Sequence, residues 1–195
     1  ACAPYRRLHL CDQHLEHMDT NKINNTHNLL LEVSLAAKHE GQSITGYYPQ
    51  YDLKYPGFSF TTCTMLARSF ADIGDIIRGK DLYIRNNQKK KKLEKNLREI
   101  FKKIYDKLEN KEAQEYYKKD DKGTKNYYKL REDWWNANRQ EIWKAITCNA
   151  KGFNYFRPTC NGQHKTQNNC RCNGDQVPTY FDYVPQYLRW FEEWA

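Results

Sequence analysis

The sequence predicts an all-α fold, a helical bundle with long loops in which disulfides fasten the helices. Apolar residues recur three and four positions apart over several segments, which is the spacing of one buried helix face. No segment alternates apolar and polar residues for long enough to indicate a strand. Seven cysteines in 195 residues are the third observation, because they are typical of a chain cross-linked in an oxidising compartment.

The first third of the chain is expected to hold one helix between irregular segments. Residues 1–27 show no regular periodicity, whereas residues 29–39 form a clear helical pattern with Gly41 as its stop. Residues 42–62 carry six tyrosines and phenylalanines and are interrupted by prolines and glycines. This density of helix breakers predicts an extended connector.

Four further helices are predicted in the rest of the chain. Residues 63–78 form the second helix and residues 127–147 the fourth. The third, residues 89–118, is expected to be continuous and about 45 Å long. Residues 149–178 are a cysteine-bearing loop, and the last helix begins at Pro185. The tryptophans of these helices are assigned to the core: Trp134, Trp135, Trp143 and Trp190.

The net charge of +8 is concentrated in two segments. Residues 63–148 carry 22 lysines and arginines against 14 acidic residues, and residues 149–172 carry 4 against none. This distribution favours polyanionic partners such as sulfated glycans, sialylated surfaces or nucleic acid. A lysine-rich helix is about as often a solvated face without a partner. The mean hydropathy of −1.02 argues against a membrane span.

The cysteine count is odd, so at least one partner is expected to lie outside these residues. The chain opens at Ala1 without a signal peptide, and we expect it to be a piece of a larger protein. A reduced cytosolic protein with free thiols is the alternative.

The sequence carries no recognisable parts of a catalytic or metal site. Cys160, His164, Cys170 and Cys172 are zinc-type donors, but they lack paired Cys-x-x-Cys spacing. Nothing marks a cysteine as activated by a neighbouring base, and no glycine-rich phosphate loop or Gly-x-Ser-x-Gly turn occurs. We therefore expect no enzyme, no cofactor and no metal.

Five blocks resemble the hallmark segments of Duffy-binding-like domains, and they occur in the order of that family. They are residues 2–11 (CAPYRRLHLC), 67–79 (ARSFADIGDIIRG), 131–136 (REDWWN), 142–148 (IWKAITC) and 182–194 (DYVPQYLRWFEEW). The last block is similar to the alpha type of these domains, found in the erythrocyte membrane protein one family of malaria parasites.

The resemblance implies a Duffy-binding-like fold with three helical subdomains. Residues 1–62 would form part of the first, with one helix among loops, and residues 63–195 the second, a helical bundle; the third would be absent. The implied function is host-cell adhesion by a variant surface antigen on the outer face of the infected red cell. The implied partners are red-cell receptors or glycans: heparan sulfate-like chains, blood-group sugars or complement receptor one. The piece itself would be monomeric, and joined to the membrane only through its parent protein.

The cysteines are expected to form at least two disulfides. Cys63 and Cys148 both lie at helix ends, and the resemblance suggests that they form a staple between the helices of the second subdomain. Cys160 is expected to pair with Cys170 in a short loop, and Cys172 is the competing partner. Spacing alone leaves this connectivity open.

The expected binding face lies on the third helix, where cations could hold a sulfated chain through several weak contacts. Its members are Lys89, Lys90, Lys91, Lys92, Lys95, Arg98, Lys102 and Lys103. Arg6 and Arg7 are second candidates, although their place in a hallmark block favours structural ion pairs. Two alternatives stay open: a basic helical protein that binds nucleic acid, and a structural spacer without a partner of its own.

Overall fold

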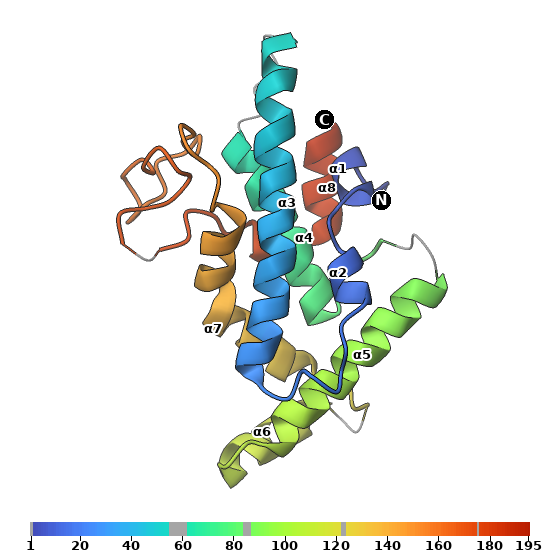
Figure 1. Ribbon diagram of the computed structural model, residues 1–195. Helices are drawn as coiled ribbons and strands as arrows, with labels where there is room; N and C mark the ends of the chain where they lie inside the picture. The colour runs from blue at the N-terminus through green and yellow to red at the C-terminus, as the bar shows by residue number, and fades with distance from the viewer. Residues whose placement is uncertain (1, 55–61, 84–86, 122–123, 175) are drawn as a thin grey trace.

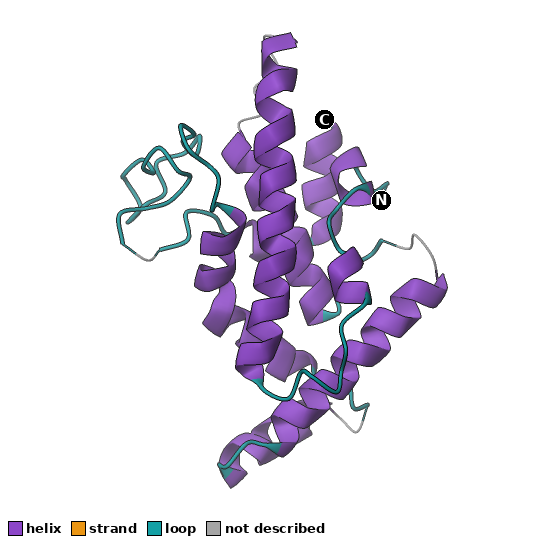
Figure 2. Ribbon diagram, viewed as in Figure 1, coloured by secondary structure: helices purple, strands orange, loops and turns teal. Residues whose placement is uncertain are grey.

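The computed structural model describes residues 2–54, 62–83, 87–121, 124–174 and 176–195, and within them the predicted all-α fold is confirmed. The elements are α1 (Tyr5–Leu8), α2 (Gln13–Glu16), α3 (Thr26–Lys54), α4 (Thr62–Arg78), α5 (Asn87–Asp106), α6 (Lys111–Asp121), α7 (Tyr128–Ile146), η1 (Phe181–Tyr183) and α8 (Gln186–Trp194). Figure 2 shows no strand among the described residues. Their β-type pairing is limited to isolated bridges in the loop that follows α7.

Helices α3, α4 and α7 pack against one another and form the centre of the bundle (Figure 1). The short helix α1 and the carboxy-terminal helix α8 lie together, so the two ends of the described chain meet: Trp194 Nε1 donates to the Cys2 carbonyl at 3.0 Å. Helix α5 crosses the base of the bundle, and α6 follows it there. The loop between α7 and η1 extends to the opposite side from α8.

Helix α4 is the core element, because all of its residues are buried. Phe70 at its centre lies 5.0 Å from the Trp135 ring and 5.3 Å from the Trp143 ring, measured between centroids. The assignment of four tryptophans to the core is confirmed, since Trp134, Trp135, Trp143 and Trp190 are all buried. A helix buried on every side requires its charged residues to be paired.

The prediction that the first helix stops at Gly41 is wrong, and so is the extended connector over residues 42–54. Helix α3 continues through Gly41 and Pro49 to Lys54, while residues 55–61 lie outside the described part of the chain. Gly41 serves close packing instead: a Cβ atom there would lie 1.9 Å from the Ile146 carbonyl oxygen at the end of α7.

The prediction of a single long helix over residues 89–118 is also wrong, because a turn between Asp106 and Lys111 separates α5 from α6. The Asn110 side chain caps the start of α6 by accepting from the Glu112 backbone N–H at 2.8 Å. Gln114 Nε2 donates to the Leu108 carbonyl at 2.7 Å, and this hydrogen bond stabilises the turn between α5 and α6.

The other three helices begin and end within two residues of the predicted positions. Residues 1–27 differ slightly from the irregular segment that was expected, because they contain the single-turn helices α1 and α2. No helix in the described ranges is both long and apolar enough to cross a membrane.

Candidate functional site

Helix α5 has a buried side that packs on the bundle and a charged side that faces solvent. Leu97, Ile100, Phe101 and Ile104 are buried at steps of three, one and three, so they form one stripe along the helix. Phe101 meets Trp134 of α7 edge to face at 6.1 Å. This contact fixes which side of α5 points outward.

Four cations follow one line on the outer side of α5. Lys91, Lys95, Arg98 and Lys102 are spaced by four, three and four residues, and all four are exposed. At 1.5 Å per residue this line, here called the α5 cation stripe, is about 16 Å long. It is part of the face that the sequence predicted.

The remaining predicted cations of the third helix lie elsewhere. Lys90 turns inward, where its Nζ donates to the Asp81 carbonyl at 2.7 Å and the Tyr83 carbonyl at 3.2 Å. Lys103 donates to the Thr20 carbonyl and is half-buried. Lys92 is exposed but stands on the other flank of the helix, and the Lys89 side chain lies outside the described residues.

Acidic neighbours neutralise only part of the α5 cation stripe. Lys95 Nζ lies 3.9 Å from Glu99, and Lys102 donates to Asp106 at 2.7 Å. The hydrogen bond and the charge of Asp106 raise the pKa of Lys102, so this cation stays protonated. Within the described ranges, Lys91 and Arg98 form no ion pair.

Arg6 and Arg7 have the structural role that their hallmark block suggested, and neither belongs to an exposed binding face. The Arg6 guanidinium lies 2.7 Å from Asp72 and 2.9 Å from Glu193. Arg7 pairs with Asp81 at 2.8 Å and with Asp12 at 3.3 Å, and both arginine side chains are 3% exposed. These pairs join the start of the chain to α4 and α8.

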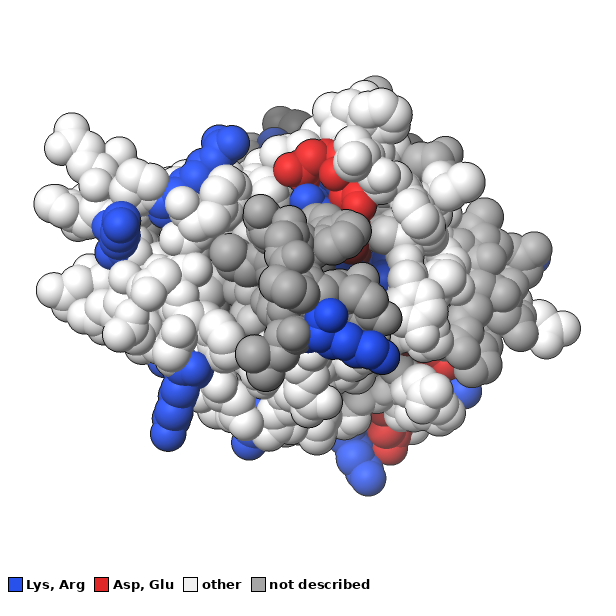
Figure 3. All heavy atoms as spheres, turned by 90° about the horizontal axis from the view of Figure 1, so that it is seen from above, with Lys and Arg blue, Asp and Glu red and all other residues white. Residues whose placement is uncertain are grey.

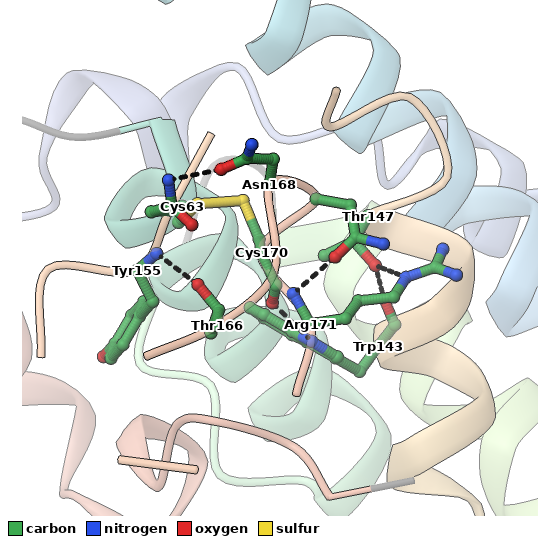
Figure 4. The surroundings of a disulfide bond; sticks show 10 residues. Cys63, Trp143, Thr147, Tyr155, Thr166, Asn168, Cys170 and Arg171 are labelled. Atoms are coloured by element: carbon green, nitrogen blue, oxygen red, sulfur yellow. Dashed lines mark hydrogen bonds between the residues drawn. A yellow bond between two sulfur atoms is a disulfide. The ribbon is translucent and has the colours of Figure 1, made fainter. Parts of the chain in front are cut away.

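The expected Cys63–Cys148 disulfide is wrong, because Cys63 bonds to Cys170 (Figure 4). The loop after α7 folds back on the bundle, where Trp143 Nε1 donates to the Cys170 carbonyl at 3.2 Å. Cys148 instead lies exposed in the turn that ends α7. Cys148 stands at the end of α7 whereas Cys170 lies in the loop that follows, so helix-end position favoured the wrong partner for Cys63.

The expected Cys160–Cys170 pair is also wrong, and the competing Cys160–Cys172 disulfide forms instead. Of the four zinc-type donors in this loop, the three cysteines are therefore held in disulfides. Where the structure describes the chain, no three His, Cys, Asp or Glu residues gather in a metal-holding arrangement. Cys2, Cys11 and Cys148 are free.

No binding residue was predicted in the disulfide-bonded loop, yet this loop exposes Phe156, Arg157 and Lys165. The basic character of this loop was visible in the sequence, since residues 149–174 contain no acidic residue. The cations of this loop are too far apart in sequence to look like a cluster.

Comparison with known proteins places this geometry in a family. The family model described as the Duffy binding domain matches residues 1–189 of this chain. The NTS-DBL1(alpha-1) domain of the Plasmodium falciparum membrane protein PfEMP1, varO strain, is similar at 48% identity and a TM-score of 0.84, covering 100% of this chain and 43% of that one. No curated protein sequence matches the chain.

Two more distant structures share the fold. A PfEMP1 DBLbeta domain solved in complex with ICAM-1 is 35% identical with a TM-score of 0.74, covering 100% of this chain and 44% of that one. Region II of Plasmodium falciparum Erythrocyte Binding Antigen 140, in complex with sialyllactose, is 25% identical with a TM-score of 0.58. The match covers 98% of this chain and 25% of that one. This chain thus spans less than half of each relative, and it belongs to the Duffy-binding domain family.

Proposed function

We propose that this chain is part of an adhesion module that binds host-cell receptors, and that the α5 cation stripe binds a sulfated glycan. Two relatives support the first part, because one was solved with the host protein ICAM-1 and the other with sialyllactose. The exposed line of four cations carries the second part.

The stripe suits a long polyanion better than a small ligand. A single exposed cation contributes little, because salt screens it over about 8–10 Å. Four cations along about 16 Å of one helix act together when one chain presents several sulfates at once. Binding by such a surface depends strongly on salt.

The wider biological setting follows from the family and belongs to the same proposal. It comprises display on the outer face of an infected red cell, and red-cell receptors or glycans as partners. Heparan sulfate-like chains fit the α5 cation stripe by charge, whereas blood-group sugars and complement receptor one would need other contacts. The division into a partial first subdomain, residues 1–62, and a second, residues 63–195, remains a prediction.

The test is binding of the chain to immobilised heparin over a range of salt concentrations. Alanine variants of the stripe are compared with a charge-matched control that removes four exposed lysines outside α5. The test variant changes Lys91, Lys95, Arg98 and Lys102, and the control changes Lys22, Lys38, Lys111 and Lys118.

Salt-sensitive binding that the stripe variant loses and the control keeps would support the proposal. Equal losses in both variants would mean that net charge alone attracts heparin, and the stripe would be discarded. Duplex DNA serves as a second polyanion, because equal affinity for DNA and heparin would favour the nucleic-acid alternative.

A further inference from the structure

Helix α8 has one side that is buried and one side that is apolar and exposed. Three of its residues are buried and hydrogen-bond to Asp72 of α4: Gln186, Arg189 and Trp190. The apolar side of a helix normally points towards the core, but on α8 an apolar side points outwards. Four residues form this side, here called the α8 apolar face: Tyr187, Leu188, Phe191 and Trp194, which are 52%, 45%, 75% and 61% exposed.

A hollow of about 290 Å³ lies at the start of the α8 apolar face. Its apolar lining comes from Leu82, Tyr183, Val184, Pro185 and Tyr187. Arg78 also lines the hollow, and it is already paired with Asp75 at 2.8 Å and with Glu132 at 3.0 Å. A cavity of about 150 Å³ accommodates benzene, so this hollow has room for one aromatic ring.

Hydrogen bonds hold the backbone around the hollow in place. The Leu82 backbone N–H donates to Gln186 Oε1 at 2.6 Å. Arg189, which is anchored on α4, donates to the Val184 carbonyl at 2.6 Å. A surface that is fixed before it meets a partner loses little conformational entropy on binding.

The exposed apolar area is large for a surface that faces only solvent. With about 150–250 Å² for each aromatic side chain, the α8 apolar face and the apolar lining of the hollow together expose about 600 Å². This area is at the upper end of the apolar patches that monomeric proteins show. Two such patches in contact would bury about 1,200 Å², which is the size of the smaller specific interfaces.

The two basic surfaces of the chain lie away from α8. Helix α5 crosses the base of the bundle, and the loop after α7 extends to the opposite side (Figure 1). Seen from above, blue side chains project from the side of the molecule that this loop forms (Figure 3). Glu192, which is on α8 itself, pairs with Arg68 at 3.1 Å. Two copies can therefore meet through their α8 apolar faces without bringing their basic surfaces together.

We propose that two copies of this chain associate through their α8 apolar faces about a two-fold axis. Phe191 follows Tyr187 by one turn, so its ring stands about 6 Å along the helix from the hollow. When two α8 helices pack antiparallel, the Phe191 ring of each copy enters the hollow of the other. Such a contact is self-complementary and closes after two copies.

This proposal departs from the monomer that the family resemblance implied. Both α5 cation stripes stay exposed in the dimer, so one particle presents two polyanion-binding lines and gains avidity for a surface. The dimer itself does not depend on glycan binding by the stripe.

The test measures the mass of the chain in solution over a range of concentrations by sedimentation equilibrium. Cys2 and Cys148 are alkylated first, so that no intermolecular disulfide contributes. The test variant is Phe191→Glu. The matched control is Phe156→Glu, which makes the same change at an exposed aromatic residue of the loop after α7. Circular dichroism and mass mapping of the two disulfides check that each variant is folded.

We expect the wild type and the control to approach twice the monomer mass of 23.4 kDa as concentration rises. Phe191→Glu should weaken association about thirtyfold or more, as the loss of an interface hot spot does. Association should persist at about 1 M salt, where charges are screened beyond about 3 Å. The proposal is wrong if the wild type is still monomeric at about 1 mM, if Phe191→Glu associates normally, or if high salt abolishes association. A monomer would leave the face to a different protein chain.

A mixing experiment tests the contact between ring and hollow. Phe191→Ala removes the ring and keeps the hollow, whereas Val184→Trp places a bulky ring in the hollow and keeps Phe191. Each variant alone should associate weakly. Their equimolar mixture should associate more tightly, because one Phe191 ring then meets one open hollow. A mixture that associates no better than either variant alone would overturn the proposed arrangement.

Discussion

Arg189 and Asp72 meet across 117 positions of the chain, where a guanidinium N–H donates to the Asp72 carboxylate at 2.7 Å. The two side chains are 2% and 0% exposed. Asp72 also accepts from Gln186 at 3.1 Å and pairs with Arg6 at 2.7 Å. One buried carboxylate on α4 therefore connects the first and the last helices of the bundle. Arg6, Asp72 and Arg189 belong to three hallmark blocks that are far apart in sequence.

Replacing Asp72 by asparagine should destabilise the fold strongly. The substitution removes the carboxylate that Arg6 and Arg189 share, while Arg6 keeps Glu193 and Arg189 keeps Asp75. We therefore expect a loss of about 3 kcal/mol, the lower end of the range for breaking a buried ion pair. Urea unfolding under non-reducing conditions measures the free energy of unfolding. The control is Lys118→Ala, whose exposed pair with Glu115 spans 3.8 Å and should contribute almost nothing. Equal stability of the two variants would contradict the prediction.

The contribution of Asp72 should disappear only in strong acid. Burial opposes its charge, but Arg6, Arg189 and the hydrogen bond from Gln186 outweigh burial and lower the pKa of Asp72 below its usual value. Its stabilisation is then complete above the pKa of an unfolded aspartate, about 3.9, and is lost as pH falls through the lower folded value. The difference in unfolding free energy between wild type and Asp72→Asn should stay constant from about pH 7 to 5. A difference that already shrinks over that range would indicate a raised pKa.

The disulfide connectivity can be checked by peptide mapping and by stability. Non-reducing mass spectrometry should find Cys63 linked to Cys170 and Cys160 linked to Cys172. Because the first bond closes 107 residues and the second closes 12, the chain-entropy relation assigns about 4–5 and about 3 kcal/mol to them. The Cys63→Ala/Cys170→Ala variant should therefore lose more stability than Cys160→Ala/Cys172→Ala. The reverse order would show that native contacts, rather than loop length, determine the effect.

The free cysteines should react with alkylating agents at different rates. Cys148 and Cys2 are exposed, whereas burial and the charges of Glu40 and Asp12 raise the pKa of Cys11 to about 12. The thiolate is the reactive form, so Cys11 is almost entirely unreactive at pH 8. Iodoacetamide treatment of the native chain should modify Cys2 and Cys148 within the time that leaves Cys11 untouched. In urea all three should react alike, which controls for local sequence effects.

Helix periodicity predicted the helices that have a single buried face. It failed where a side-chain hydrogen bond determines where a helix begins or ends. The stripe of Leu97, Ile100 and Ile104 was readable because one side of α5 is buried. The break before α6 depends on the Asn110 cap, which spacing does not reveal.

The candidate site was predictable only in part. The sequence located the basic helix, but the inward turn of Lys90 depends on the Asp81 carbonyl, which another segment supplies. The disulfide partners of Cys63 and Cys160 depend on how the loop after α7 folds back, which is a tertiary property. The buried roles of Arg6 and Arg7 could be expected from the hallmark block, but their partners could not.

Gly41 provides the sharpest test of the packing between α3 and α7. An added Cβ would lie 1.9 Å from the Ile146 carbonyl oxygen, so Gly41→Ala must push the two helices apart. We expect a loss of about 1–3 kcal/mol in the free energy of unfolding, even though alanine is the better helix former. Gly46 is the matched control in the same helix, because a Cβ there meets nothing within 4 Å. Gly46→Ala should instead stabilise the chain by about 0.5–1 kcal/mol. If both substitutions stabilise the chain, α3 does not approach α7 as closely as described, and Gly41 has no packing role.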